Sequence, residues 1–275
     1  MTDYNAIDAV NISTLKELWA KSPRHYRHRL QRPSEPTPAM QFGTLVHCAV
    51  LEPDRLAERF IAEPDFGDCR LKANKAARDA WRAEFEGSTA ERISAAWVER
   101  VERIAEAVRT DPVAAPYLSE GRPEVVLQWR DEETGLACKG RVDWLSSTTI
   151  VGLKTTKAID TRKFASQAAS LGYALQWAFY HDGYAASNVA LPLVEIVVET
   201  EPPFDVVVYR IPDDVLDEGR NAYRDALLKL KSCRTFNDWP GVANGNELTF
   251  ALPRWATTHD DDDLSDLEWG EEHAA

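Results

Sequence analysis

Three side chains that could cleave a phosphodiester follow one another within residues 123–156. Glu124 begins one expected strand, Asp143 lies at the end of the next, and Lys154 lies at the end of the third. Adjacent strands could bring these side chains to one edge of a sheet. Mg²⁺ prefers carboxylate oxygens, a bound ion activates water, and a lysine can orient that water and offset developing negative charge. The alternative is that all three are ordinary solvated strand ends.

The rest of the chain must supply the elements that position these side chains. Apolar spacing and capping residues predict helices, and β-rich runs bounded by turn residues predict strands. The expected helices cover 11–20, 42–53, 71–86, 90–109, 162–186 and 215–231, and the expected strands cover 125–129, 137–145, 149–153, 193–200 and 205–211. This order predicts a mixed β-sheet flanked by helices, in the α/β or α+β class, with a helical N-terminal part.

Length and composition fit one large domain with a tail. The chain has 275 residues, and 44% of them are hydrophobic, which is enough to bury a core. We expect a single domain over residues 1–258, with a helical part at 1–120 and a catalytic sheet at 121–235. Residues 259–275 form an acidic tail that we expect to be disordered on its own. The tail is either solubilising or, through its few apolar side chains, able to dock on a basic groove.

The net charge of −13 argues against a nucleic-acid partner until its distribution is considered. Eight of the 45 acidic residues lie in the tail, so the remainder is only mildly acidic and could present a local basic groove. The segment 21–32 is strongly basic, and residues 71–86 carry basic side chains three and four apart. The side chains expected to contact DNA phosphates are Arg24, Arg27, Arg29, Lys72, Lys75 and Arg78. Solvated helix surfaces are the alternative.

The sequence gives no sign of a membrane or secretory protein. No apolar run reaches about 18 residues, and the N-terminus has no signal-peptide features, so we expect a cytoplasmic protein. Its cysteines, Cys48, Cys69, Cys138 and Cys233, are widely spaced. We expect them to be free thiols, and the lack of a close pair argues against an iron–sulfur cluster.

Several motifs resemble the PD-(D/E)XK nucleases, and among them the RecE or exodeoxyribonuclease VIII type of phage exonuclease. The similar segments are SPRHYRHRL, FGTLVHCAVLEP, LKANKAARDAWRAEF, PEVVLQWRDEETGLACKGRVDW with the following IVGLKTT, and LGYALQWAFYHDGY. They run from about residue 12 to about residue 232. Each is weak alone, but their order and spacing are specific. The resemblance implies a restriction-endonuclease-like core of the kind found in lambda exonuclease.

The resemblance also assigns roles to the matching residues. It implies that His47 and Asp143 bind the metal, that Lys154 is the catalytic lysine and that Glu124 is an auxiliary carboxylate. From the residues alone, His47 is more typical of a packed core histidine.

Two residues of the expected helix 162–186 also match the family. Gln176 and Tyr180 lie four apart and therefore share a face of that helix. The resemblance implies that they hold the scissile phosphate or the lysine. Without the resemblance, the more usual interpretation is that Gln176 and Tyr180 are a pair on the helix surface.

The sequence departs from the family at Gly152, where an acidic residue is expected two positions before the lysine. Glycine cannot ligate a metal and is a poor strand residue. We therefore expect cleavage to be severely impaired, by about 10³-fold or more. One explanation is an inactivating substitution in an otherwise intact nuclease, which the other motif residues favour. The other is a natural loss that leaves a DNA-binding relic. A shifted carboxylate, such as Glu124, could hold one metal and leave weak activity.

The resemblance implies a Mg²⁺-dependent exonuclease, with Mn²⁺ as a substitute ion, that degrades one strand of linear duplex DNA from 5′ to 3′ in phage-type recombination. It further implies double-stranded DNA ends as substrate, a ring-shaped trimer or tetramer, a single-strand annealing protein of the RecT or beta type as partner, and a phage or prophage origin. The alternatives are an endonuclease on the same core and a catalytically dead DNA-end-binding or scaffold module. A purely structural protein fits the retained residues poorly.

Overall fold

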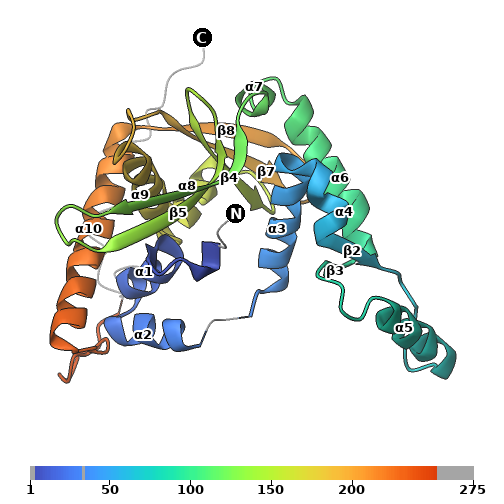
Figure 1. Cartoon of the computed structure of the whole chain (residues 1–275), viewed down its shortest axis with the longest axis horizontal. Helices are drawn as coiled ribbons and strands as arrows, with labels where there is room; N and C mark the ends of the chain where they lie inside the picture. The colour runs from blue at the N-terminus through green and yellow to red at the C-terminus, as the bar shows by residue number, and fades with distance from the viewer. Residues whose placement is uncertain (1–3, 33–34, 253–275) are drawn as a thin grey trace, which may run out of the picture.

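A six-stranded mixed sheet lies at the centre of the molecule, and helices cover both of its faces (Figure 1). The structure, a computed structural model, describes residues 4–32 and 35–252, so the predicted tail at 259–275 lies outside the described residues. The strands of the central sheet are β1 (Val10–Asn11), β4 (Arg122–Arg130), β5 (Ala137–Leu145), β6 (Ile150–Thr156), β7 (Leu193–Glu199) and β8 (Val206–Ile211). The predicted fold class is confirmed.

Along the described chain, most of the α-helices lie between β1 and β4, and the others lie between β6 and β7 or after β8. The α-helices are α1 (Ile12–Ala20), α2 (Pro23–Gln31), α3 (Pro38–Leu51), α4 (Leu56–Arg59), α5 (Lys72–Glu84), α6 (Ala95–Thr110), α7 (Ala115–Leu118), α8 (Thr161–Ser170), α9 (Tyr173–Ala185) and α10 (Asp213–Phe236). Short 3-10 helices lie at Tyr4–Ala6 and Pro53–Arg55. Among the described residues, no helix is long and apolar enough to cross a bilayer.

The central sheet opens into a fork between β5 and β6. Antiparallel pairing joins them only at Trp144 with Val151 and at Leu145 with Ile150. From there β6 runs parallel to β7 over seven residues, while β5 continues beside β4 and meets β1 at its other end. β7 and β8, both expected as strands, form an antiparallel hairpin. The fork leaves a gap in the hydrogen-bond ladder that side chains from both strands can enter.

Two apolar cores hold the helices against the sheet. On one face, α1, α9 and α10 pack through side chains such as Leu15, Phe179 and Leu227. On the other, α3 and α6 pack against β6 and β7 around Leu45 and Ile104. Because side chains alternate along a strand, Val151 and Leu153 point toward α3 and α6. Gly152 and Lys154 therefore belong to the face that α9 covers.

Local sequence was misleading at three places. The expected helix 162–186 is two helices, because the chain turns at Gly172, whose φ is +61°. The expected helix 42–53 begins earlier, at Pro38, the first residue of α3, where a missing N–H costs nothing. Ile93, expected at the start of a helix, lies in β3 (Glu91–Ser94), which pairs with β2 (Phe60–Glu63) in an unforeseen two-stranded sheet.

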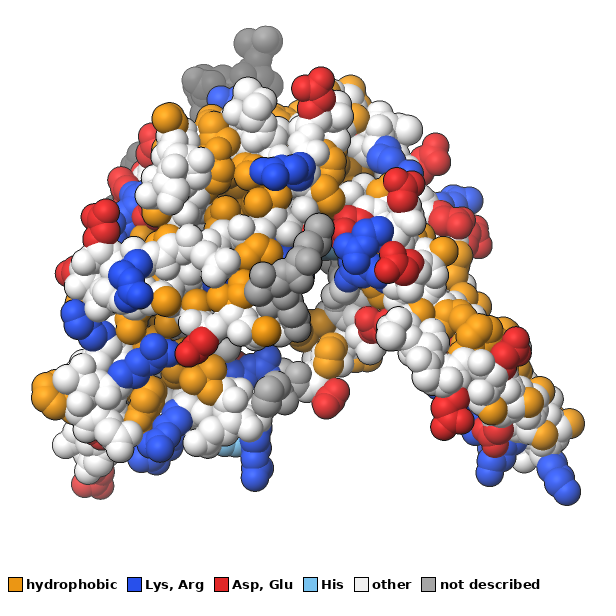
Figure 2. All heavy atoms as spheres, viewed as in Figure 1, with side chains coloured by type: hydrophobic (Ala, Val, Ile, Leu, Met, Phe, Trp, Pro, Cys, Tyr) orange, Lys and Arg blue, Asp and Glu red, His pale blue; other side chains and the backbone are white. Residues whose placement is uncertain are grey.

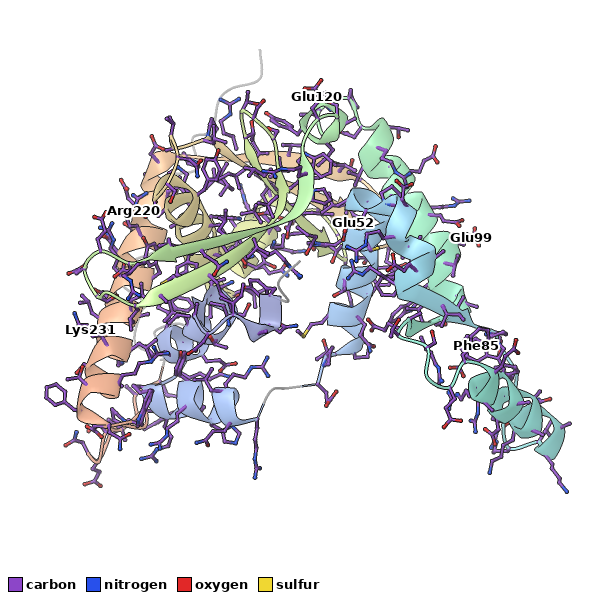
Figure 3. The ribbon with its side chains drawn as sticks, viewed as in Figure 1. Glu52, Phe85, Glu99, Glu120, Arg220 and Lys231 are labelled. Atoms are coloured by element: carbon purple, nitrogen blue, oxygen red, sulfur yellow. The ribbon has the colours of Figure 1, made fainter. Side chains whose placement is uncertain are left out.

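The β2–β3 pair carries α5 outward as an arm that stands away from the central sheet (Figure 1). No residue of α5 is buried. An aromatic cluster holds the arm together, since the rings of Trp81 and Phe85 lie 4.8 Å apart and Phe66 lies 6.3 Å from Trp81. Figure 3 shows Phe85 at the end of α5 nearer the body. Helix formation at 71–86 is thus confirmed, but on a projecting element.

A half-buried polar network joins α9 to α10. Asp182 accepts hydrogen bonds from Arg220 at 2.6 and 2.8 Å and from the Tyr223 hydroxyl at 2.7 Å, and His181 Nδ1 lies 3.0 Å away. Arg220 is labelled on α10 in Figure 3. Burial raises the pKa of Asp182, but these hydrogen bonds outweigh it and hold that pKa well below its usual value. The network therefore stabilises the charged carboxylate.

We expect Asp182→Asn to lower the free energy of unfolding by about 1–3 kcal/mol at pH 7, because an amide pairs poorly with the guanidinium. The folded pKa lies below the unfolded value of about 3.9, so the stabilisation is complete above that pH and is lost as the pH falls through the folded pKa. Urea unfolding at pH 7 and pH 3 tests this, and the difference between the two proteins should shrink at pH 3. Asp217→Asn, at an exposed partner of Arg220, is the control and should have little effect.

The four cysteines lie in the described part of the chain and are free, as expected. Cys48, Cys138 and Cys233 are buried, and Cys69 is half-buried. Cys48 and Cys138 pack in the two apolar cores.

Candidate active site

Asp143 stands in the fork between β5 and β6. Its Oδ2 accepts a hydrogen bond from the Leu153 N–H at 2.9 Å, in place of the strand pairing that is lost there. Its Oδ1 lies 3.7 Å from His47 Nδ1, which α3 brings to the fork. Lys154 Nζ lies 3.8 Å from Oδ2. Three residues singled out in the sequence thus meet at one point.

Lys154 is the cation of this cluster. Its ammonium lies 3.3 Å from Glu195 Oε1 on the neighbouring strand β7, and only 17% of its side chain is exposed. Burial lowers the pKa of Lys154, but the carboxylates of Glu195 and Asp143 outweigh burial, so its pKa is raised. The side chain is therefore charged at neutral pH.

His47 and Glu124 complete a group that could hold a metal ion. Each of His47, Glu124 and Asp143 offers one donor atom, and these atoms lie within 4.8 Å of one another. Burial is the main cause that lowers the pKa of His47, so its imidazole is neutral and can donate a lone pair. Glu124 has a φ of +53° and lies 2.7 Å from Arg141 Nε. Burial raises the pKa of Glu124, and Arg141 opposes that effect.

Helix α9 supplies the wall that faces the fork. Gln176 accepts a hydrogen bond at 3.0 Å from Lys16 of α1, and not from Lys154. Tyr180 packs on β5 so closely that a Cβ at Gly140 would lie 2.8 Å from its ring. Burial raises the pKa of Tyr180, so its hydroxyl stays protonated. The structure therefore places Gln176 and Tyr180 beside the cluster, and their contact with a phosphate stays a prediction.

Lys16 is a residue of the cluster that sequence reasoning missed. Its ammonium, like that of Lys154, faces the ring of Tyr173, at 5.4 and 5.6 Å from the centroid respectively. Burial lowers the pKa of Lys16 to about 8, with help from the charge of Lys154. Lys16 sits on an ordinary amphipathic helix, so no local pattern distinguishes it from a surface lysine.

Glu195 is the second residue that sequence reasoning missed, and here a signal was present. Strand β7 reads LVEIVVE, and every residue in it is buried. Glu195 interrupts that apolar run, which a second glutamate, Glu199, ends, and the Glu195 side chain is 1% exposed. A buried carboxylate costs several kcal/mol unless it is compensated, so such a position points to function or to a fixed partner. Glu195 pairs in register with Gly152.

A fork with a carboxylate on one strand and a lysine on the next is the arrangement that the PD-(D/E)XK motif leads us to expect. A family described as "PDDEXK-like domain of unknown function (DUF3799)" matches residues 11–249. This chain belongs to that family.

Two solved structures were compared with the PDDEXK-like domain. A proposed exonuclease from Eubacterium rectale is 14% identical, with a TM-score of 0.57 over 90% of this chain and 91% of that chain. A phage-related exonuclease from Haemophilus somnus is 14% identical and covers 63% of this chain and 92% of that chain, but its TM-score of 0.32 carries no argument. No curated protein matches the chain. The family and the first structure confirm the PD-(D/E)XK fold.

The basic residues predicted to bind DNA lie outside the cluster in the fork of the PDDEXK-like domain. They form two groups, one on α2 and one on α5, and Figure 2 shows the surface hollowed between the two elements. On α2, Arg24 and Arg27 are exposed, and the Arg27 guanidinium lies 5.6 Å from the Trp239 ring. Arg29 is half-buried.

On the α5 arm, the predicted basic stripe is partly neutralised. Lys72 and Lys75 are exposed, but Arg78 pairs with Asp79 at 2.9 Å. These residues therefore lie away from the cluster in the fork, and their contact with DNA stays a prediction.

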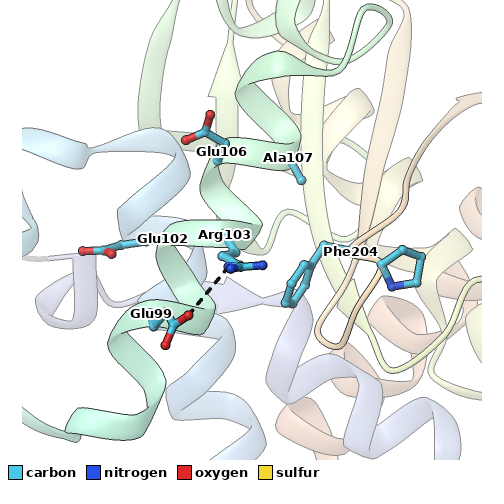
Figure 4. Close-up of a pocket in the computed structure, with 7 residues that line it drawn as sticks. Glu99, Glu102, Arg103, Glu106, Ala107 and Phe204 are labelled. Carbon is cyan, nitrogen blue, oxygen red and sulfur yellow. Dashed lines mark ion pairs between the residues drawn. The ribbon is translucent and has the colours of Figure 1, made fainter.

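Two surface depressions differ in their suitability for a phosphate backbone. One lies beside the end of β6 and includes Thr155, Thr156 and Lys157 together with Arg100 of α6. Thr155 follows Lys154 along β6, but the alternation of side chains places it on the opposite face of the sheet, toward α3. The other, shown in Figure 4, lies between α6 and the β7–β8 turn, and its lining includes Glu99, Glu102, Arg103 and Glu106. Its three glutamates would repel phosphate, so we assign the site to the fork.

Proposed function

We propose that this PDDEXK-like domain is a divalent-metal-dependent DNA nuclease, and that it acts as an exonuclease on one strand of linear duplex DNA. The meeting of Asp143 and Lys154 in the fork, with His47 facing the same carboxylate, carries the proposal. Carboxylates and a neutral imidazole beside a charged lysine are the groups that metal-assisted phosphodiester hydrolysis requires.

The residues of the fork fit a divalent metal ion. His47, Asp143 and Glu124 present donor atoms close together, and Glu195 Oε1 is a buried oxygen without a hydrogen-bond partner among the described residues. Asp143 and His47 would hold the ion, with Glu124 beside them. A bound Mg²⁺ or Mn²⁺ would lower the pKa of a water and neutralise phosphate charge. Of the two ions, we propose Mg²⁺ as the natural one.

The side chains around the fork suit a phosphate substrate. Lys154 is charged and can attract a non-bridging oxygen and offset the charge that develops on it. Lys16, fixed by Gln176, offers a second ammonium on the α9 side of the cluster. Tyr180, protonated, can donate a hydrogen bond to the same group. These three residues would position the scissile phosphate.

The finer features of the proposal come from the resemblance to RecE-type enzymes. We propose a 5′-to-3′ polarity, a ring-shaped trimer or tetramer, and a single-strand annealing protein as partner in phage-type recombination. We place the protein in the bacterial cytoplasm, encoded by a phage or prophage. The description of the Eubacterium rectale protein as an exonuclease and the basic residues that border the hollow between α2 and α5 support the exonuclease form.

The impairment that Gly152 led us to expect is untested, and the position of Glu195 argues against it. The Gly152 position does not leave an open space for a lost ligand, because a neighbouring carboxylate fills it. We therefore propose that the chain as it stands cleaves DNA.

A comparison of linear and covalently closed circular duplex DNA tests the proposed function. With Mg²⁺, the protein should degrade the linear form and leave the circle intact, and EDTA should stop degradation. Cleavage of the circle would instead support an endonuclease on the same core. Binding of linear DNA without cleavage, with either Mg²⁺ or Mn²⁺, would support the DNA-end-binding module and contradict the enzyme.

A further inference from the structure

The carboxylate of Glu195 occupies the place that a side chain at residue 152 would take. Strands β6 and β7 run parallel, with Gly152 directly opposite Glu195. A Cβ added to Gly152 would lie 2.5 Å from Glu195 Oε2, 2.6 Å from Oε1 and 2.7 Å from Cδ. An aspartate at 152 would therefore direct its carboxylate into a space that already contains one. Neighbouring strands are about 4.8 Å apart, a distance that a glutamate can span.

The surroundings of Glu195 hold its carboxylate at this place. Oε2 accepts a hydrogen bond from Trp177 Nε1 of α9. Oε1 has Lys154 Nζ as an ion-pair partner at 3.3 Å, yet it has no well-directed hydrogen bond among the described residues. Lys154 Nζ in turn lies 3.8 Å from Asp143 Oδ2. The ammonium thus stands between two carboxylates, which marks this space as one that favours a cation.

A simpler role for Glu195 is that of a counterion for Lys154. That role accounts for the ion pair between Glu195 and Lys154, but not for the glycine at position 152, opposite Glu195. A glycine in the middle of a seven-residue strand weakens the strand. Here the glycine removes the atoms that would collide with the Glu195 carboxylate. The two unusual residues, a glycine on β6 and a buried glutamate on β7, explain each other.

We propose that Glu195 supplies from β7 the acidic group that the PD-(D/E)XK motif places two residues before the lysine. It completes, with Asp143 and His47, the set of side chains that binds the divalent ion. This inference rests on the proposed function for its catalytic meaning, but its claim about metal binding can be tested alone. The acidic function of the motif has moved from one strand to its neighbour, and the site is intact.

Metal affinity is the primary test, with free Mn²⁺ measured by electron paramagnetic resonance. We expect Glu195→Gln, which keeps the size of the side chain, to weaken Mn²⁺ binding by at least about tenfold. Glu199→Gln is the matched control, because Glu199 is buried on the same strand but accepts hydrogen bonds from the main chain of Ile159 and Asp205. The control should bind Mn²⁺ as the wild type does. Equal affinity of the wild type and Glu195→Gln would overturn the inference.

Moving the carboxylate back to β6 is the second test. We expect the double variant Gly152→Asp with Glu195→Val to recover most of the Mn²⁺ affinity and of the cleavage that Glu195→Val loses. Gly152→Asp alone should gain nothing, because it crowds two carboxylates into one place. If Gly152→Asp alone raises both Mn²⁺ affinity and cleavage above the wild type, the glycine is a true lesion and the inference is wrong.

The two proposals fail in different ways. A wild-type protein that binds Mn²⁺ in a manner dependent on Glu195 but never cleaves DNA contradicts the proposed function and supports the metal site. A wild-type protein that cleaves linear DNA as fast with Glu195→Gln as without it supports the function and contradicts the inference. Thermal unfolding of each variant in EDTA shows which of them are folded.

Discussion

Replacing Asp143 with asparagine should slow cleavage of linear duplex DNA on the order of 10³-fold or more. Asparagine keeps the size of the side chain and an oxygen that can accept the hydrogen bond from the Leu153 N–H, so the fork should persist. The substitution removes the charge that faces both His47 and Lys154. The substitution should therefore both weaken metal binding and disturb the position of the Lys154 side chain.

Single-turnover cleavage of end-labelled DNA after addition of Mg²⁺ measures this effect. Glu132→Gln is a suitable control, because it removes a carboxylate from the exposed turn between β4 and β5. The control should cleave at the wild-type rate. A cleavage rate of Asp143→Asn within a fewfold of wild type would mean that the reaction centre lies elsewhere.

Replacing Lys154 with methionine should stop cleavage while leaving the metal site able to bind. We expect a loss on the order of 10²–10³-fold in rate, the usual effect of removing one group that stabilises transition-state charge. Without the ammonium, Asp143 and Glu195 become unpaired neighbours, and an uncompensated buried charge costs about 3–5 kcal/mol. The variant should thus be destabilised in EDTA.

A divalent ion should rescue the stability of Lys154→Met, because it replaces the missing positive charge between the carboxylates. The rise in melting temperature on adding Mn²⁺ should exceed that of the wild type. Lys163→Met, at an exposed lysine of α8, controls for loss of a positive charge and should respond as the wild type does. If Mn²⁺ fails to stabilise Lys154→Met, the two carboxylates do not share a cation site.

The part of the site that the sequence predicted lies on adjacent strands of one local segment. Asp143 and Lys154 are separated by a single turn, so strand order alone brings them together. His47 could be placed through the resemblance, because its helix has a characteristic motif, and in the structure its Nδ1 lies 3.7 Å from Asp143 Oδ1. The pattern of apolar residues likewise sufficed for the sheet and most helices.

The features of the site and the fold that were not predicted depend on contacts between residues far apart in the sequence. Glu195 reaches the site through the parallel register of β6 and β7, which joins residues 43 positions apart only once α8 and α9 have crossed the sheet. Lys16 meets Gln176 across 160 residues. The break at Gly172 was missed because the apolar spacing of two successive helices resembles that of one. Gly152 could not be understood without its neighbour on β7.

The most direct test of the account is the cleavage of end-labelled linear duplex DNA by the wild-type chain, with Mg²⁺ and with EDTA, beside Asp143→Asn. The account predicts rapid release of labelled nucleotides by the wild type with Mg²⁺, none with EDTA, and almost none by the variant. A wild-type chain that binds the DNA but releases nothing with Mg²⁺ or Mn²⁺, or a variant that releases nucleotides as fast as the wild type, would contradict it.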